Sequence, residues 1–178
     1  MSVAPNGGHY ARRTLVAWVE DKPGVLSHVT NLFRRRNYNI ESLTVGHTET
    51  PGISRMTIVV WGNDAVVEQV IKQLYKLVSV TKITDISDDA AVVRELALIK
   101  VHAVANNRAE VKQLVDIFRA QIIDVSPDAM VIEITGDEEK VDSLINILRP
   151  IGIKELSRTG VWLWYAAPEL RHLTRGKA

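Results

Sequence analysis

The sequence contains no cysteine, and this absence excludes several kinds of chemistry at once. A chain without thiols has no disulfides, thiolate metal sites, iron–sulfur clusters or cysteine nucleophile. An excess of one charge is also lacking, since 22 Lys and Arg stand against 21 Asp and Glu and give a formal net charge of +1. No overall field attracts the chain to nucleic acid or to an anionic membrane, so we expect neither as a partner.

Long apolar runs and export signals are missing too. No uninterrupted apolar stretch approaches the roughly 20 residues of a membrane helix. The first dozen residues are polar and Gly-rich, without the apolar segment of a signal peptide. We therefore expect a cytoplasmic protein. Its 178 residues, 46% of them apolar and 24% charged, suffice for one large domain or two small ones.

The familiar catalytic and metal-binding patterns are absent as well. The sequence has no G-x-S-x-G, Walker A or G-x-G-x-x-G string. Glu20 and Asp21 are adjacent and point in different directions, so they do not form a facing acid/base pair. No H-E-x-x-H spacing occurs among the five histidines, which are His9, His28, His47, His102 and His172. We expect no catalytic site, no metal and no cofactor in this chain.

The apolar pattern predicts two successive units with the same order of elements. In the first unit we expect strands over 14–19, 40–45, 56–61 and 80–86, with helices over 25–36 and 64–77. In the second unit we expect strands over 95–104, 122–125, 130–135 and 151–157, with helices over 108–118 and 137–149. The predicted fold class is α+β, with two tandem ferredoxin-like βαββαβ sandwiches that each place two helices on a four-stranded sheet.

The domain boundaries follow from this pattern. We expect a disordered tail over 1–11, a first domain over 12–86, a linker over 87–93, a second domain over 94–160 and a tail over 161–178. In the first domain Val16 and Trp18, like Val59 and Trp61, alternate with equally apolar neighbours. Both faces of that sheet are therefore expected to be partly buried, against the sister domain or another subunit.

The turn over 20–24, Glu-Asp-Lys-Pro-Gly, can hold a small amphoteric molecule. Pro23 lacks an N–H and Gly24 permits close approach, so the free amides at the start of the next helix can receive a carboxylate. Asp21 and Asn39 supply acceptors for an ammonium group. An apolar wall is expected from three residues: Val25, Leu26 and Ile40. Together these groups describe a site for a free apolar amino acid.

The turn alone is a weak signal, because Pro and Asp are common at ordinary helix starts. The second unit provides a comparison within the same chain. Its equivalent turn over 105–108 reads Ala-Asn-Asn-Arg and has no Pro-Gly. We therefore expect binding in the first domain only.

The string EDKPGVLSHVTNLFRRRNYNIESLTVG over 20–46, continued by SRMTIVV over 54–60, resembles the small regulatory subunit of acetolactate synthase (acetohydroxyacid synthase), whose amino-terminal half is an ACT domain. The strings RELALIKV over 94–101 and FRAQIIDVSPD over 118–128 are similar to the carboxy-terminal domain of that subunit. The resemblance covers the chain from about Arg12 to Gly160.

This resemblance implies a non-catalytic partner of a large subunit that makes acetolactate and CO2 from two pyruvates in valine and isoleucine biosynthesis. The large subunit is expected to carry thiamine diphosphate, Mg and FAD. The small subunit is expected to raise its activity and to confer feedback inhibition by valine. In the family the effector lies between the ACT domains of a homodimer, touched by the turn of one chain and the second strand of the other. Carried onto this sequence, the effector residues are Asp21, Gly24, Val25, Leu26, Asn39 and Ile40.

Two features depart from the family pattern. Position 21 is Asp where some members carry Asn, which strengthens the expected contact with an ammonium group. After Val161 the chain reads WLWYAAPELRHLTRG, which is longer and more aromatic than the usual ending, and we assign it no role.

Two other functions remain as alternatives. One is a free-standing amino-acid sensor for another enzyme. The other is an RNA-binding sandwich, since Trp18 and Trp61 fall in strands where such modules place stacking aromatics. The missing RNP1 signature and the low net charge favour buried or interface tryptophans instead. The basic run over 34–36 either docks an acidic partner or complements the dipole of its own helix, and we weigh both interpretations equally.

Overall fold

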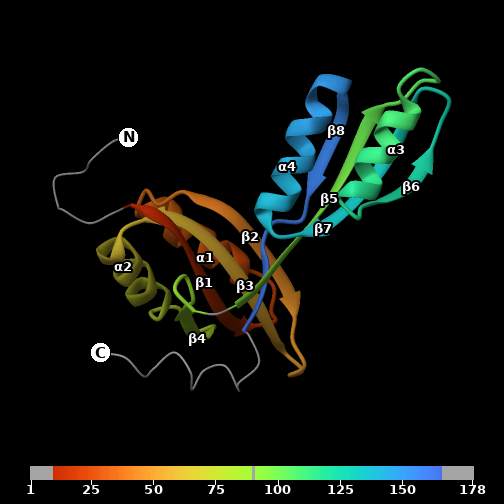
Figure 1. Ribbon diagram of the computed structural model, residues 1–178. Helices are drawn as coiled ribbons and strands as arrows, with labels where there is room; N and C mark the ends of the chain where they lie inside the picture. Colours follow the sequence, from red (N-terminus) through yellow and green to blue (C-terminus); the bar gives the residue numbers. More distant parts are fainter. Residues whose placement is uncertain (1–9, 90, 166–178) are drawn as a thin grey trace. The chain divides into compact units, whose positions relative to one another are not determined.

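The computed structural model describes residues 10–89 and 91–165 and confirms the predicted α+β fold class (Figure 1). The chain divides into two compact units, of which the second spans Val92–Leu163. Of the disordered tail expected over 1–11, residues 1–9 lie outside the described residues, whereas Ala11 already belongs to the first strand. Residues 166–178 of the expected C-terminal tail also lie outside the described residues.

The first unit consists of a four-stranded antiparallel sheet with two helices on one face (Figure 1). The strand order is β2-β3-β1-β4, so β2 is an edge strand. In chain order the elements are β1 (Ala11–Glu20), α1 (Val25–Arg35), β2 (Ile40–His47), β3 (Ile53–Gly62), α2 (Asp64–Leu74) and β4 (Val80–Asp85).

Alternating apolar residues build the core of the first unit. Leu15, Ala17 and Val19 of β1 face the helices, because every second side chain of a strand lies on the same face. They pack against the apolar stripes of α1 and α2, including Phe33, which is only 1% exposed. Full burial of a side chain of this size contributes about 1.5–3 kcal/mol. These contacts fix the helices, and with them the turn that precedes α1.

The opposite face of the first sheet is only partly covered, as the alternation of apolar residues predicts. Val16 and Val59 on that face are 0% and 2% exposed, whereas Trp61 is 53% exposed. Trp18 is half-buried, with Lys82 Nζ 4.9 Å and the Arg55 guanidinium carbon 5.6 Å from the centre of its ring. Cations from the two strands β3 and β4 thus lie within cation–π distance of the Trp18 ring.

The second unit repeats the βαββαβ order and adds a strand. Its elements are β5 (Ala91–His102), α3 (Arg108–Ile117), β6 (Gln121–Val125), β7 (Ala129–Gly136), α4 (Glu138–Leu148), the short 3-10 helix η1 (Arg149–Ile151), β8 (Ile153–Arg158) and β9 (Trp162–Tyr165). The sheet order is β6-β7-β5-β8, and β9 pairs with β5.

Strands β9 and β5 correct two boundaries expected from the sequence. Its residues lie in the expected tail over 161–178, and β5 begins at Ala91, inside the expected linker over 87–93. Thr159 bonds to Leu96 of β5 in both directions, by Thr159 N to the Leu96 oxygen at 3.0 Å and by Leu96 N to the Thr159 hydroxyl at 3.1 Å. The aromatic residues that follow favour an extended strand. The second sheet therefore has five strands rather than four.

An ion pair between Arg158 of β8 and the buried Glu95 of β5 links the two strands, and it leads to a prediction about stability. Glu95 is 6% exposed and accepts from Arg158 Nε at 2.9 Å, while Arg158 Nη1 donates to Asp142 at 2.7 Å. The hydrogen bond to Glu95 raises the pKa of Arg158, so this side chain is charged at any working pH. Arg158→Met should destabilise the second unit by about 2–3 kcal/mol, because it leaves a buried carboxylate unpaired.

Hydrogen exchange of the β5 and β8 amides measures this loss. Lys154→Met is the matched control, since it removes an exposed pair with Asp128 that solvent already screens. Equal protection in the two variants would show that the Glu95–Arg158 pair does not stabilise the unit.

Candidate effector-binding site

The turn before α1 is open and has no side-chain cap. Gly24 occupies the N-cap position with φ 89° and ψ −16°, a left-handed conformation that L residues rarely adopt. A Cβ built on Gly24 would meet nothing within 4 Å, so the space beside the turn is free. By contrast, Asn63 caps α2 and Asp137 caps α4, accepting from Val66 N and Lys140 N. Val25 N donates within the turn to the Lys22 oxygen at 3.4 Å, and no side chain caps the other first-turn amides of α1, which can face an external acceptor.

The other residues of the turn differ in what they can offer a ligand. The Asp21 amide donates to the Gly52 oxygen at 2.8 Å, which ties the turn to the loop between β2 and β3. The Leu26 side chain is 44% exposed. Val25 is 6% exposed and belongs to the core, so it contributes backbone to the site and its side chain anchors the turn. The expected apolar wall on this side therefore consists of Leu26.

A second hollow lies at the other end of α1. Asn39 and Ile40 line it at the start of β2, together with three residues of α1, Thr30, Phe33 and Arg34, and with Asn37 and Tyr38 of the connection. Asn39 is exposed and Ile40 is half-buried. An amide and an aliphatic side chain are thus presented next to each other, as the sequence analysis expected.

Within one chain the structure does not bring these two groups of residues together. Helix α1, with 11 residues, separates them by about 16 Å along its axis. The sheet register gives the same result, because Asp21 bonds to Gly52 while Ile40 pairs with Val60. This stretch of β3 spans more than about 20 Å at the usual rise per residue. We refer to these two separate groups of residues as the half-sites of the candidate site.

The structure adds one residue that the sequence analysis did not place in the site. His47, at the end of β2, lies with Nδ1 3.1 Å from Asp21 Oδ2. Both side chains are largely exposed, so the contact holds the Asp21 carboxylate at the mouth of the turn without burying it. The signal for this contact is the hairpin between β2 and β3, whose register fixes which end of β2 lies beside the turn.

The equivalent turn of the second unit is held by its own side chains, although α3, like α1, has no side-chain cap hydrogen bond. Asn107 accepts from Val104 N at 2.8 Å and donates to the His102 oxygen at 3.2 Å. Arg108 Nη2 donates to three carbonyl oxygens, those of Ala103, Ser126 and Pro127. These bonds tie the turn to the end of β5 and to the connection between β6 and β7. The expectation of a single effector turn per chain stays a prediction.

The part of the chain that the structure describes shows no group of three or more His, Cys, Asp and Glu residues placed to hold a metal ion. None of the helices described is long and apolar enough to cross a membrane.

Two βαββαβ units, the first with an open glycine turn, define a protein of the tandem ACT type. Each of the two units matches a known family model. The family described as "AHAS small subunit-like ACT domain" matches residues 15–82, and "Small subunit of acetolactate synthase" matches residues 94–163. This chain belongs to the acetolactate synthase small-subunit family.

Individual relatives cover nearly the whole chain. A probable acetolactate synthase small subunit of Archaeoglobus fulgidus is 57% identical over 149 residues, which are 84% of this chain and 93% of the relative. The acetolactate synthase small subunit of Bacillus subtilis is 49% identical over 152 residues, 84% of this chain and 87% of the relative. The crystal structure of the small subunit from Thermotoga maritima has a TM-score of 0.82 at 45% identity and covers 88% of this chain and 98% of its own.

Proposed function

We propose that this chain is the regulatory subunit of acetolactate synthase, which activates the catalytic large subunit and makes it sensitive to inhibition by valine. Family membership supports the regulatory role. The observation that supports the effector assignment is the turn at Gly24, which has no side-chain cap and has open space beside its Cβ position. No described side chain caps this turn.

The chemistry of the two half-sites fits a free apolar amino acid. The α-carboxylate binds the positive end of α1, and the ammonium group lies between Asp21 and Asn39. Leu26 and Ile40 contact the aliphatic side chain. Valine and isoleucine differ by one methylene, which an apolar pocket distinguishes by about 1–3 kcal/mol at most. Isoleucine should therefore inhibit partially.

Two chains are needed to assemble one site. β2 is an edge strand, and twofold antiparallel pairing of two β2 strands places the Ile40 end of one chain beside the His47 end of the other. Because His47 contacts Asp21, this pairing brings Asn39 and Ile40 of one protomer to the open turn of its partner. Each dimer then holds two equivalent sites.

Valine acts on the large subunit by favouring one arrangement of this dimer over another. A ligand shifts such an equilibrium only by its differential affinity for the two arrangements, which is typically about 1–3 kcal/mol of coupling. Inhibition is therefore expected to be graded and reversible, with no chemistry performed by this chain.

Titration of this chain into a purified large subunit loaded with thiamine diphosphate, Mg and FAD tests the proposal. Alone, the chain should form no acetolactate; added to the large subunit it should raise the rate, and valine should then lower it. A free-standing sensor would bind valine and leave the large subunit unchanged, which would reject the regulatory role.

Asn39→Ala should weaken valine binding by about ten- to a hundredfold, the usual effect of losing a hydrogen bond to a charged group. Calorimetric titration of valine into the purified chain measures it. Asn31→Ala, an exposed Asn on α1 outside both half-sites, is the control and should leave the dissociation constant unchanged. An unchanged constant in Asn39→Ala would remove this residue from the site.

A further inference from the structure

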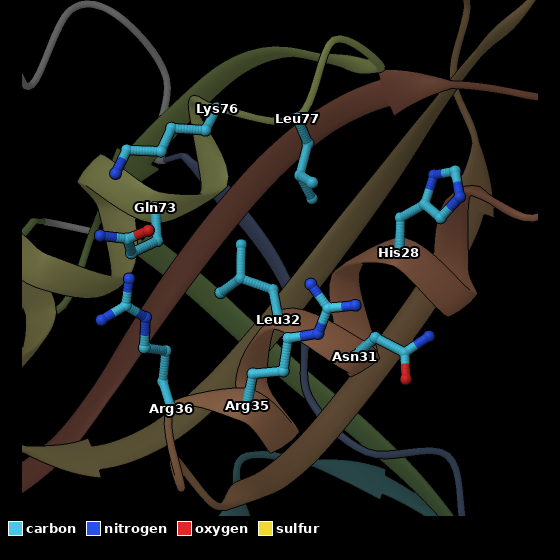
Figure 2. Close-up of a pocket in the computed structure, with 8 residues that line it drawn as sticks. All are labelled: His28, Asn31, Leu32, Arg35, Arg36, Gln73, Lys76 and Leu77. Atoms are coloured by element: carbon cyan, nitrogen blue, oxygen red, sulfur yellow. The ribbon is translucent and has the colours of Figure 1, made fainter.

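A groove between α1 and α2 plays no part in the proposed effector site. Its floor is apolar, because Leu32 of α1 and Leu77 after α2 are partly buried against the core. Three cations line it: Arg35, Arg36 and Lys76. In Figure 2 the two leucine side chains lie between the helices, with Lys76 and Arg36 on one side of them and Arg35 on the other.

The charge of this groove is not balanced within the described part of the chain. No lining residue is Asp or Glu, and α1 contains no acidic residue. Arg35, Arg36 and Lys76 are all exposed, and none of them takes part in an ion pair among the described residues. Three like charges around one groove repel each other, so the surface is complementary to a negatively charged partner.

The helix dipole explains only part of this arrangement. Arg35 and Arg36 lie at the carboxy-terminal end of α1 and Lys76 lies just past that of α2, where cations are favoured. The dipole does not require an apolar floor between the cations. An apolar centre with a charged rim is the usual anatomy of a protein-binding surface.

We propose that this groove docks a segment of the catalytic large subunit that carries carboxylates and at least one large aliphatic side chain. The inference rests on the proposed function, which supplies the large subunit as the partner. The aliphatic side chain lies between Leu32 and Leu77, and the carboxylates pair with the cations of the rim. Dimerisation through the edge of β2 leaves this helical face accessible, because α1 and α2 cover a face of the sheet rather than its edge.

The double variant Arg36→Glu/Lys76→Glu tests this interface. The concentration of chain that gives half-maximal activation of the large subunit should rise at least tenfold, and added salt should weaken activation by the wild-type chain. Valine binding to the purified variant should be unchanged, since both substitutions lie outside the effector half-sites. Lys112→Glu, a single charge reversal on an exposed position of α3, is the control for Lys76→Glu alone and should activate normally.

The outcomes separate this inference from the proposed function. If the wild-type chain neither binds nor activates the large subunit, both fail. If the wild-type chain activates and the double variant activates at the same concentration, only the docking inference fails. Tight binding of inorganic pyrophosphate that the double variant loses, with activation unchanged, would assign the groove to a free anion instead. Circular dichroism checks the fold, and Lys76→Gln alone should shift activation in the same direction to a smaller extent.

Discussion

Replacing Gly24 by Asp should abolish inhibition by valine while leaving activation of the large subunit in place. The new carboxylate enters the open space beside the turn, where the α-carboxylate of valine is expected to bind. Two like charges about 4 Å apart repel by about 4 kcal/mol at an effective dielectric constant near 20, which lowers affinity more than about a hundredfold. The left-handed backbone adds a stability cost of about 1 kcal/mol.

The variant Gly24→Asn distinguishes the effect of the new charge from the effect of backbone strain at position 24. Asn has nearly the shape of Asp and tolerates the left-handed conformation, but it brings no charge. It should therefore retain much more valine sensitivity than Gly24→Asp in an assay of acetolactate formation against valine concentration. Full valine inhibition in Gly24→Asp would contradict the assignment of this turn to the effector site. Loss of activation as well would show that the turn also serves the large subunit.

Mixing two defective chains should restore valine sensing, and this result distinguishes a shared site from one within a chain. Gly24→Asp damages only the turn, and Asn39→Ala damages only the start of β2. In a mixed dimer one site receives both defects and the other receives neither. Random pairing makes about half of the dimers mixed, so about a quarter of all sites should recover.

The measurement is calorimetric titration of the mixture, unfolded together and refolded, at valine concentrations too low for either variant alone. A chain carrying both substitutions, mixed with Asn39→Ala, is the control and should recover nothing, because no pairing then gives an intact site. Absence of recovery in the test mixture would place both half-sites in one chain or in another kind of dimer.

The order of elements could be predicted because strand and helix periodicities are strong in this sequence. Val16 and Trp18 show why faces are harder to predict, since apolar residues on both sides of β1 conceal which side the helices cover. The aromatic run after Gly160 has strand propensity and forms β9, but propensity alone does not show that it pairs with β5. The register of each strand decides such pairings, and a single sequence does not display it.

The sequence yields candidate effector residues, but it does not show how far apart they lie in one chain. Asp21 and Asn39 are only 18 positions apart in the chain, yet the length of α1 and the register of β3 set them at opposite ends of the sheet. From the sequence, the Val25 side chain is expected in the apolar wall of the effector site. In the structure this side chain is buried in the core, because the packing of α1 turns it inward, and the sequence does not show this packing. The contact between Asp21 and His47 likewise depends on a hairpin whose turn geometry the sequence leaves open.

The placement of the half-sites at opposite ends of α1 makes chain concentration a second input to the proposed sensor. A lone protomer should not bind valine at physiological concentrations, because half of the required contacts belong to another molecule. Valine in turn stabilises the paired state by mass action, so it should hold dimers together on dilution. A cell that makes too little of this chain would then lose sensitivity to valine before it loses the chain itself.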